Sequence, residues 1–210
     1  MFELKVAAEN VMRAVEFWYE FASTYSYPAA MRIQALADKA RVDVVWKPFL
    51  LGPIFARQGW SDSPFNLFPA RGTYMWRDLA RICANERLPL KLPPARFPQN
   101  SLKAARIALS LEQGIEAFTR AVYTANFARQ EDIADDAILS GILERLGTKA
   151  ESVLETANLL ETKKKLRLQT EDAVARGIFG APSFTIGEEL FWGNDRLEEA
   201  VDFARRHHAR

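Results

Sequence analysis

Hydrophobic and polar residues follow three successive patterns at the start of the chain. Over residues 14–21 apolar side chains such as Phe17 alternate with side chains such as Glu16 that point the other way, which predicts a β-strand. Residues 26–41 carry an apolar stripe at helical spacing, and residues 42–49 return to the residue types that strands favour. This strand–helix–strand order predicts two parallel strands joined by a right-handed crossover.

Helical periodicity then continues through the middle of the chain. Met75, Leu79 and Ile82, for example, share one face of an expected helix. Four prolines within residues 88–100 predict an irregular connection there, because proline interrupts helices. No strand pattern interrupts the region formed by residues 53–176.

The last part of the chain changes character again. Residues 183–186 and 189–192 predict two short strands across a turn that contains Gly187, and therefore a β-hairpin. Asp195 and Glu198 have the spacing of a capping box, in which two side chains satisfy the first backbone amides of a helix. We therefore expect a final helix that starts here and ends close to the end of the chain.

The two ends of the chain together predict one four-stranded sheet. A β-α-β unit at the start and a β-β-α unit at the end are the two parts of an α/β, thioredoxin-like fold, and the stretch between them is a large all-helical insertion. We accordingly predict a thioredoxin-like domain made of residues 14–52 and 177–210, and an inserted helical domain made of residues 53–176.

Composition and charge reduce the number of functions that the sequence can support. The formal net charge is +1 over 210 residues, which gives no electrostatic argument for binding nucleic acid. The lysine run at residues 163–165 is interpreted as a solvated helix face. No apolar run reaches the about 20 residues of a membrane-spanning helix, and residues 1–13 do not resemble a secretory signal. The sequence therefore predicts a cytoplasmic protein with no membrane partner.

The scarcity of cysteine and histidine excludes several kinds of chemistry. Cys83 is the single cysteine, so an internal disulfide, a dithiol redox centre and a cysteine zinc site are not expected. The two histidines, His207 and His208, stand at the end of the chain, which argues against a histidine metal site or a Ser-His-Asp triad. Any reactive group is therefore expected to come from a bound ligand.

The turn between the first strand and its helix carries the first candidate site. A helix N-terminus presents unpaired amides and a partial positive charge, so it stabilises an anion. Redox proteins with this layout place a Cys-x-x-Cys pair here, and the chain keeps the spacing as Ser23 and Ser26. The Ser23 hydroxyl can donate a hydrogen bond to a thiolate that a ligand brings. The alternative is that Ser23 and Thr24 are ordinary helix caps.

Two further candidates lie near the end of the chain. Pro182 enters the third strand, where a cis bond after Ala181 would leave the backbone of Ala181 free to pair with an extended peptide. The alternative is an ordinary edge-strand proline. Residues 191–196 start the final helix, whose amides offer a second anion site with Asp195 placed to pair an ammonium group. The alternative is a plain turn and helix cap.

At these three places the chain resembles the 2-hydroxychromene-2-carboxylate isomerases, relatives of the kappa-class glutathione transferases in the DsbA-like thioredoxin superfamily. Thr24 departs from the family pattern by replacing a proline, and Pro28 by replacing a common leucine. The family lysine that approaches the substrate carboxylate has no clear match: Phe55 aligns near it, and Arg57 is the candidate substitute. The resemblance spans residues 14–204 and is carried by segments 23–27, 47–52, 74–79, 97–102, 177–184 and 191–197.

The resemblance implies that glutathione is the cofactor and that Ser23 is the catalytic residue, whose hydroxyl stabilises the glutathione thiolate. The residues that it implies for glutathione binding are Ser23, Ala181, Pro182, Trp192, Gly193, Asn194, Asp195 and Arg196. The residues expected on the substrate side are Phe55, Arg57, Tyr74, Phe97 and Asn100, with Trp60 as a further wall residue.

The activity implied by the resemblance is that of a glutathione-dependent isomerase. Its reaction would interconvert 2-hydroxychromene-2-carboxylate and trans-o-hydroxybenzylidenepyruvate, or a related intermediate of aromatic compound catabolism, in a homodimer. The first alternative is a kappa-type glutathione transferase, which uses the same thiolate but releases a conjugate. The second alternative is a non-catalytic thioredoxin-fold module that binds thiol peptides or partner proteins.

Overall fold

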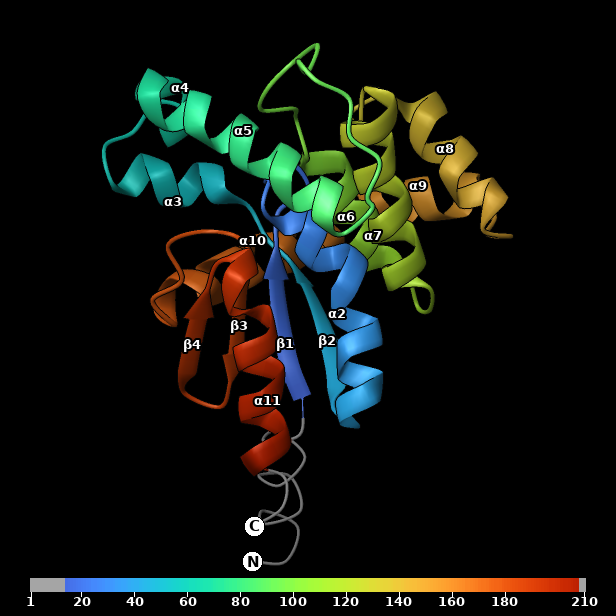
Figure 1. Cartoon of the computed structure of the whole chain (residues 1–210). Helices are drawn as coiled ribbons and strands as arrows, with labels where there is room; N and C mark the ends of the chain where they lie inside the picture. The colour runs from blue at the N-terminus through green and yellow to red at the C-terminus, as the bar shows by residue number, and fades with distance from the viewer. Residues whose placement is uncertain (1–13, 208–210) are drawn as a thin grey trace, which may run out of the picture.

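The computed structural model describes residues 14–207 of the chain and contains a four-stranded sheet with the order β2-β1-β3-β4 (Figure 1). β1 pairs in parallel with β2 and antiparallel with β3, which forms the predicted hairpin with β4. This arrangement confirms the thioredoxin-like fold. The strands are β1 (Ala14–Tyr19), β2 (Asp43–Pro48), β3 (Ser183–Ile186) and β4 (Glu189–Trp192).

Helices cover both faces of the sheet, and the region between β2 and β3 is helical, as the periodicity predicts. α2 and α11 pack against one face, and α10 packs behind the opposite face (Figure 1). Residues 88–100 form the expected irregular connection. The helices are α2 (Ser26–Ala40), α3 (Leu51–Arg57), α4 (Pro64–Leu67), α5 (Pro69–Asn85), α6 (Leu102–Ser110), α7 (Ile115–Tyr123), the π-helical η1 (Thr124–Arg129), α8 (Asp136–Arg145), α9 (Ala150–Asn158), α10 (Leu160–Ala175), the 3-10 turn η2 (Asn194–Arg196) and α11 (Leu197–His207).

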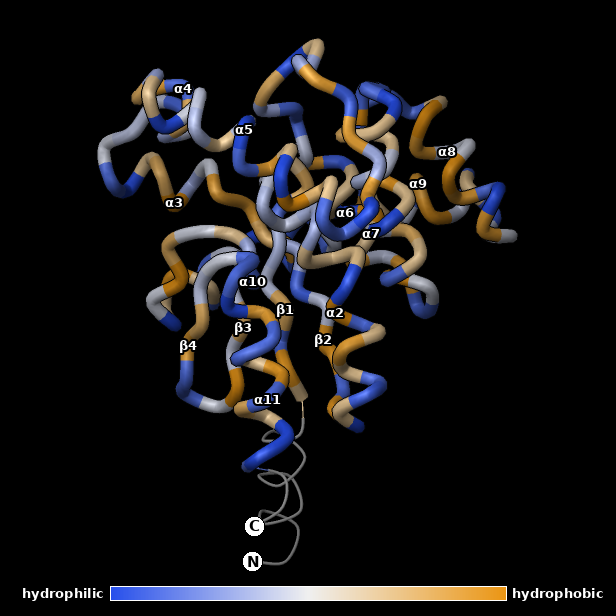
Figure 2. The backbone as a smooth tube through the Cα atoms, in the orientation of Figure 1, coloured by the Kyte–Doolittle hydropathy of each residue, from blue (hydrophilic) through white to orange (hydrophobic). Residues whose placement is uncertain are grey.

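β1 is buried on both faces, although its sequence alternates. Phe17 and Tyr19 belong to the main core cluster, where Phe17 stacks on Phe184 of β3 with 5.5 Å between ring centroids. Trp18 points to the other face and packs against Phe49 in a second cluster that α10 completes. Figure 2 shows hydrophobic positions along β1 and β2 between the packed helices. β1 is therefore the central strand, and its packing on both sides fixes where the turn into α2 lies.

Several inserted helices and the sheet contribute to the same main core cluster. Ile33 of α2, Phe118 of α7 and Leu139 of α8 belong to the same buried cluster as the residues of β1. The hydroxyl groups of Tyr19 and Thr119 also lie 2.8 Å apart across this boundary. The division into a thioredoxin-like domain and an inserted domain stays a prediction, while the main core cluster includes residues of both parts.

Two local expectations at the ends of elements are wrong. The first strand ends at Tyr19 rather than at residue 21, because the chain turns there and the Ser23 amide donates to the Glu20 carbonyl at 2.9 Å. The capping box is replaced by the η2 turn that precedes α11. The carboxylate of Glu198 instead accepts a hydrogen bond from Arg32 of α2 at 2.5 Å. Across residues 14–207, no helix combines the length and the apolar character that crossing a membrane requires.

Candidate functional site

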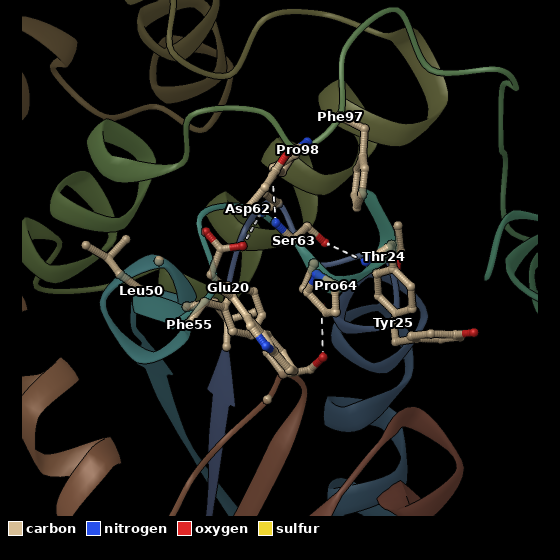
Figure 3. A pocket seen from close by; sticks show the side chains of 18 of the residues that line it. Glu20, Thr24, Tyr25, Leu50, Phe55, Asp62, Ser63, Pro64, Phe97 and Pro98 are labelled. Carbon is tan, nitrogen blue, oxygen red and sulfur yellow. Dashed lines mark hydrogen bonds between the residues drawn. The ribbon is translucent and has the colours of Figure 1, made fainter. Parts of the chain in front are cut away.

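A cleft of about 1000 Å³ opens where β1 ends, beneath the helices α3, α4 and α5. Figure 3 shows Leu50 and Phe55 on one side of it, Thr24 and Tyr25 on the other, and Phe97 above. Most of the lining is aromatic or aliphatic. The parts of the chain that supply it are residues 20–25, the stretch from 50 to 74, residues 97–102, residues 179–181 and residues 192–193.

Most of the residues predicted from the sequence meet in this cleft, although they come from distant parts of the chain. The predicted residues that line it are Ser23, Phe55, Trp60, Tyr74, Phe97, Asn100, Ala181, Trp192 and Gly193. The predicted residues that are not part of its lining are Arg57, Pro182, Asn194, Asp195 and Arg196.

The Ser23 hydroxyl joins the start of α2 to the start of β3. It donates a hydrogen bond to the carbonyl of Ala181, 158 residues away, at 2.9 Å, and accepts one from the Ser26 amide at 3.3 Å. The Ala181–Pro182 peptide bond is cis. The Ala181 carbonyl that was expected to be free thus already accepts one hydrogen bond, from the Ser23 hydroxyl. A backbone amide that donates to a hydroxyl oxygen makes that hydroxyl a stronger donor.

Helix capping accounts for only part of this arrangement. Ser23 does contact the first amide of α2, as the capping alternative requires. The residue at the cap position is Tyr25, whose side chain makes no capping hydrogen bond, and the Thr24 hydroxyl is buried with no hydrogen-bond partner within residues 14–207. Ser23 thus combines a capping contact with exposure to the cleft, whereas Thr24 does not cap the helix.

Trp192 forms the rim of the cleft beside Ala181. Its ring packs on Phe179 with 4.7 Å between centroids, and half of the side chain is exposed. Gly180 allows this position, because a Cβ there would lie 2.4 Å from the indole nitrogen of Trp192. Gly193 has φ +111°, a value that favours glycine, and its amide donates to the Pro182 carbonyl at 2.9 Å.

Gly180→Ala is therefore expected to push the Trp192 ring out of place and, if the glutathione site expected from the sequence lies here, to weaken glutathione binding about 10-fold. Titration calorimetry with glutathione measures this change. Gly52→Ala is the matched control, because Gly52 also lines the cleft but a Cβ there meets no atom within 4 Å. Equal affinity of the two variants would show that the position of Trp192 does not matter for binding.

The turn before α11 is held from outside the cleft. Arg32 of α2 donates to the side-chain oxygen of Asn194 at 3.0 Å, and Asn194 is buried. Arg196 pairs with Asp195 at 3.4 Å and with Glu199 at 3.1 Å. These contacts orient the turn, and they leave the Asp195 carboxylate at the surface, where an ammonium group can reach it.

Glu20 is a functional candidate that the sequence reasoning missed. Its carboxyl group is buried and lines the cleft, where it accepts hydrogen bonds from the Ala22 amide at 2.8 Å and from the Ser101 hydroxyl. Burial raises its pKa to about 7, against the lowering effect of those hydrogen bonds. An acidic residue directly after an apolar strand is the signal that could have found it.

Arg71 is the second missed residue. It is the one cationic side chain in the cleft lining among residues 14–207, and its guanidinium lies 4.6 Å from the ring centre of Phe68. The predicted cation, Arg57, lines a separate cavity instead. Arg71 lies in the first turn of α5, so only the packing of α5 over the cleft brings its charge to the site.

Cys83 is not suited to act as a reactive thiol. It is buried on the core side of α5, and burial raises the pKa of its thiol to about 11. It therefore stays protonated near neutral pH. No group of three His, Cys, Asp or Glu side chains within residues 14–207 is arranged to hold a metal ion.

Comparison with known proteins identifies the family. The 2-hydroxychromene-2-carboxylate isomerase of Sphingobium xenophagum is 27% identical over 187 residues, which cover 89% of this chain and 95% of the relative. Human glutathione S-transferase kappa 1 is 27% identical over 202 residues, with 89% and 88% covered. A solved structure of a 2-hydroxychromene-2-carboxylate isomerase superposes with a TM-score of 0.81 at 24% identity, covering 93% of this chain and 98% of that one. The DSBA-like thioredoxin domain model matches residues 14–203, and the chain therefore belongs to that family.

Proposed function

We propose that this chain is a glutathione-dependent isomerase that acts on a small aromatic carboxylate. The expected reaction interconverts 2-hydroxychromene-2-carboxylate and trans-o-hydroxybenzylidenepyruvate. The observation that carries the proposal is the hydrogen bond from the Ser23 hydroxyl to the Ala181 carbonyl at the wall of a large aromatic cleft. The names of the relatives support the same chemistry.

The residues of the cleft fit a peptide thiol. The backbone of Ala181 borders the cleft and can pair with an extended peptide, while Trp192 offers an apolar face at the rim. The exposed Asp195 carboxylate suits the ammonium group of a γ-glutamyl residue. When bound, glutathione supplies a thiolate that acts as a nucleophile and is released unchanged.

Ser23 is proposed to exchange one hydrogen bond for another. Its hydroxyl now donates to the Ala181 carbonyl, which is also the acceptor that a peptide amide would use. When a ligand amide takes that carbonyl, the hydroxyl is released and can turn to a sulfur anion in the cleft. The amide of Ser26, which donates to the Ser23 oxygen, polarises the hydroxyl toward this role. Ser23 thereby lowers the pKa of the bound thiol.

The substrate is proposed to lie between the aromatic walls and Arg71. Phe55 and Trp60 pack together with 5.6 Å between ring centroids, and Phe97 covers the cleft from the other side. Flat apolar walls suit an aromatic ring. Arg71 provides the positive charge that a carboxylate requires, and its guanidinium can bind both oxygens at once.

Arg71→Gln is expected to raise the KM for the chromene carboxylate about 10-fold and to change kcat less, because a charge-assisted hydrogen bond contributes roughly 1.5–3 kcal/mol. Initial rates at saturating glutathione measure the two constants. Arg77→Gln is the control: Arg77 is an exposed arginine of the same helix that does not line the cleft. An unchanged KM in Arg71→Gln would exclude Arg71 from carboxylate binding.

The direct test is to incubate the protein with glutathione and the chromene carboxylate, and separately with a halogenated nitroarene. An isomerase forms the ring-opened product without net loss of glutathione. Net consumption of glutathione would instead support the kappa-type transferase, which the human relative makes the second candidate. If calorimetry detects no heat from glutathione, the proposed function is wrong. We further propose that the chain acts as a cytoplasmic homodimer, which sedimentation and fractionation test.

A further inference from the structure

A second cavity lies beside the cleft, between α3, α6 and α10. Its volume is about 330 Å³, and it shares Leu50, Pro53 and Leu102 with the cleft wall. Its lining is strongly basic, with four cationic side chains and one acidic side chain. These charged residues are Arg57 of α3, Arg106 of α6, and Lys163, Arg167 and Glu171 of α10.

Arg106 is the least expected member of this group. Its Nε atom is buried and has no hydrogen-bond partner within residues 14–207. No carboxylate of that part of the chain lies within ion-pair distance of its guanidinium. Partial burial of a charged group without a partner is unfavourable, because the group loses water and gains no ion pair, so native proteins rarely leave such a group unpaired.

The neighbouring charges make the arrangement less favourable still. Arg167 is neutralised by Glu171 at 2.8 Å, but Arg57 and Lys163 have no ion pair with any residue in the described range 14–207. Three uncompensated cations therefore converge from three different helices on one cavity. Like charges that line one cavity repel one another, and a bound anion would reduce this repulsion.

We propose that this cavity binds a small dianion, either a phosphate group or a dicarboxylate, with the half-buried Arg106 as its anchor. A guanidinium donates to two oxygens of a phosphate or carboxylate at once, which suits Arg106 better than a lysine in its place. Arg57 and Lys163 would complete the site from the rim. A volume of about 330 Å³ accommodates a small organic acid.

This site differs from the candidate active site in its charge and in the helices that supply its charged residues. The cleft lining contains Arg71 as its cation, whereas the basic cavity takes its charges from α3, α6 and α10. Lys163 belongs to the lysine run that was interpreted from the sequence as a solvated helix face. All three lysines are exposed, and Lys163 also lines the cavity. The proposal does not depend on the isomerase activity.

Binding is tested by thermal unfolding and titration calorimetry of the full chain with inorganic phosphate and with succinate, at fixed ionic strength set by chloride. We expect a saturable rise in Tm with at least one of the two anions, because a ligand that binds only the folded state stabilises it. A response to phosphate alone assigns a phosphate ligand, and a response to succinate alone assigns a dicarboxylate. No saturable response to either anion overturns the proposal.

Substitutions of the charged lining residues test whether the anion binds in this cavity. Arg106→Gln is expected to weaken the affinity about 10- to 100-fold, and Lys163→Gln about 2- to 5-fold. Lys164→Gln is the matched control, because Lys164 is the next residue of the same helix, carries the same charge and does not line the cavity. If Arg106→Gln does not fold, Arg57→Gln combined with Lys163→Gln replaces it, since both side chains are exposed. Equal weakening in Lys164→Gln would show general charge screening and overturn the site.

Discussion

Ser23→Ala is expected to lower isomerase turnover about 100-fold while glutathione still binds. The variant removes the one hydroxyl that bridges the start of α2 and the Ala181 carbonyl, and with it the donor proposed for the bound sulfur. Loss of one donor to a developing or stored anion in a protected site typically reduces the rate by about 10²-fold or more. The thiol pKa in the complex should rise, so the remaining activity should increase toward alkaline pH.

Three measurements separate this result from misfolding. The thiolate absorbance of bound glutathione reports its pKa, calorimetry reports its affinity, and the rate is followed as a function of pH. Ser152→Ala is the control, because it removes an exposed serine hydroxyl on α9, away from the cleft. Full turnover in Ser23→Ala would contradict the proposed role of Ser23, since the thiolate would then be activated without its hydroxyl.

Glu20→Gln is expected to change how stability depends on pH. The folded protein holds the Glu20 proton up to a pKa of about 7, compared with about 4.5 for the exposed group. Between these values the folded state binds more protons than the unfolded state, so the contribution of Glu20 is complete below pH 4.5 and is lost as the pH rises through 7. The loss amounts to about 3 kcal/mol, and glutamine should abolish it.

Urea unfolding at pH 5 and at pH 8 measures this effect as the difference between wild type and variant. Glutamine can still accept from the Ala22 amide and can donate to Ser101, so the fold should be kept. Glu112→Gln, which changes an exposed carboxyl, is the control and should follow the wild type at both values. If Glu20→Gln also follows the wild type, Glu20 is ionised in the fold at pH 5 and its burial does not control its protonation.

The fold could be predicted from the periodic stretches of the sequence, because the spacing of apolar residues indicates which side chains face a core. The alternation around Phe17 indicated a strand and the stripe through Met75 and Leu79 indicated the buried face of a helix, and the structure confirms both elements. The hairpin at Gly187 followed from turn chemistry in the same way. Each of these features depends on neighbours in the sequence, which is why no three-dimensional information was needed.

The site details that were missed depend on contacts between distant elements. Arg71 rather than Arg57 lies in the cleft because α5 packs over the cleft. No local sequence pattern predicts this packing. The capping box did not form: the η2 turn precedes α11, and Glu198 instead accepts a hydrogen bond from the distant Arg32. The Ala181 carbonyl was expected to be free, but its partner lies 158 residues earlier in the chain.

The sheet order has a consequence for synthesis on the ribosome. β1 is an inner strand with β2, an early neighbour, on one edge and β3, which begins at Ser183, on the other (Figure 1). Until that late hairpin leaves the exit tunnel, the nascent chain presents an unpaired β1 edge beside an incomplete aromatic core. We expect chaperones to hold this intermediate, and translation stalled before β3 to yield aggregates rather than a smaller stable protein.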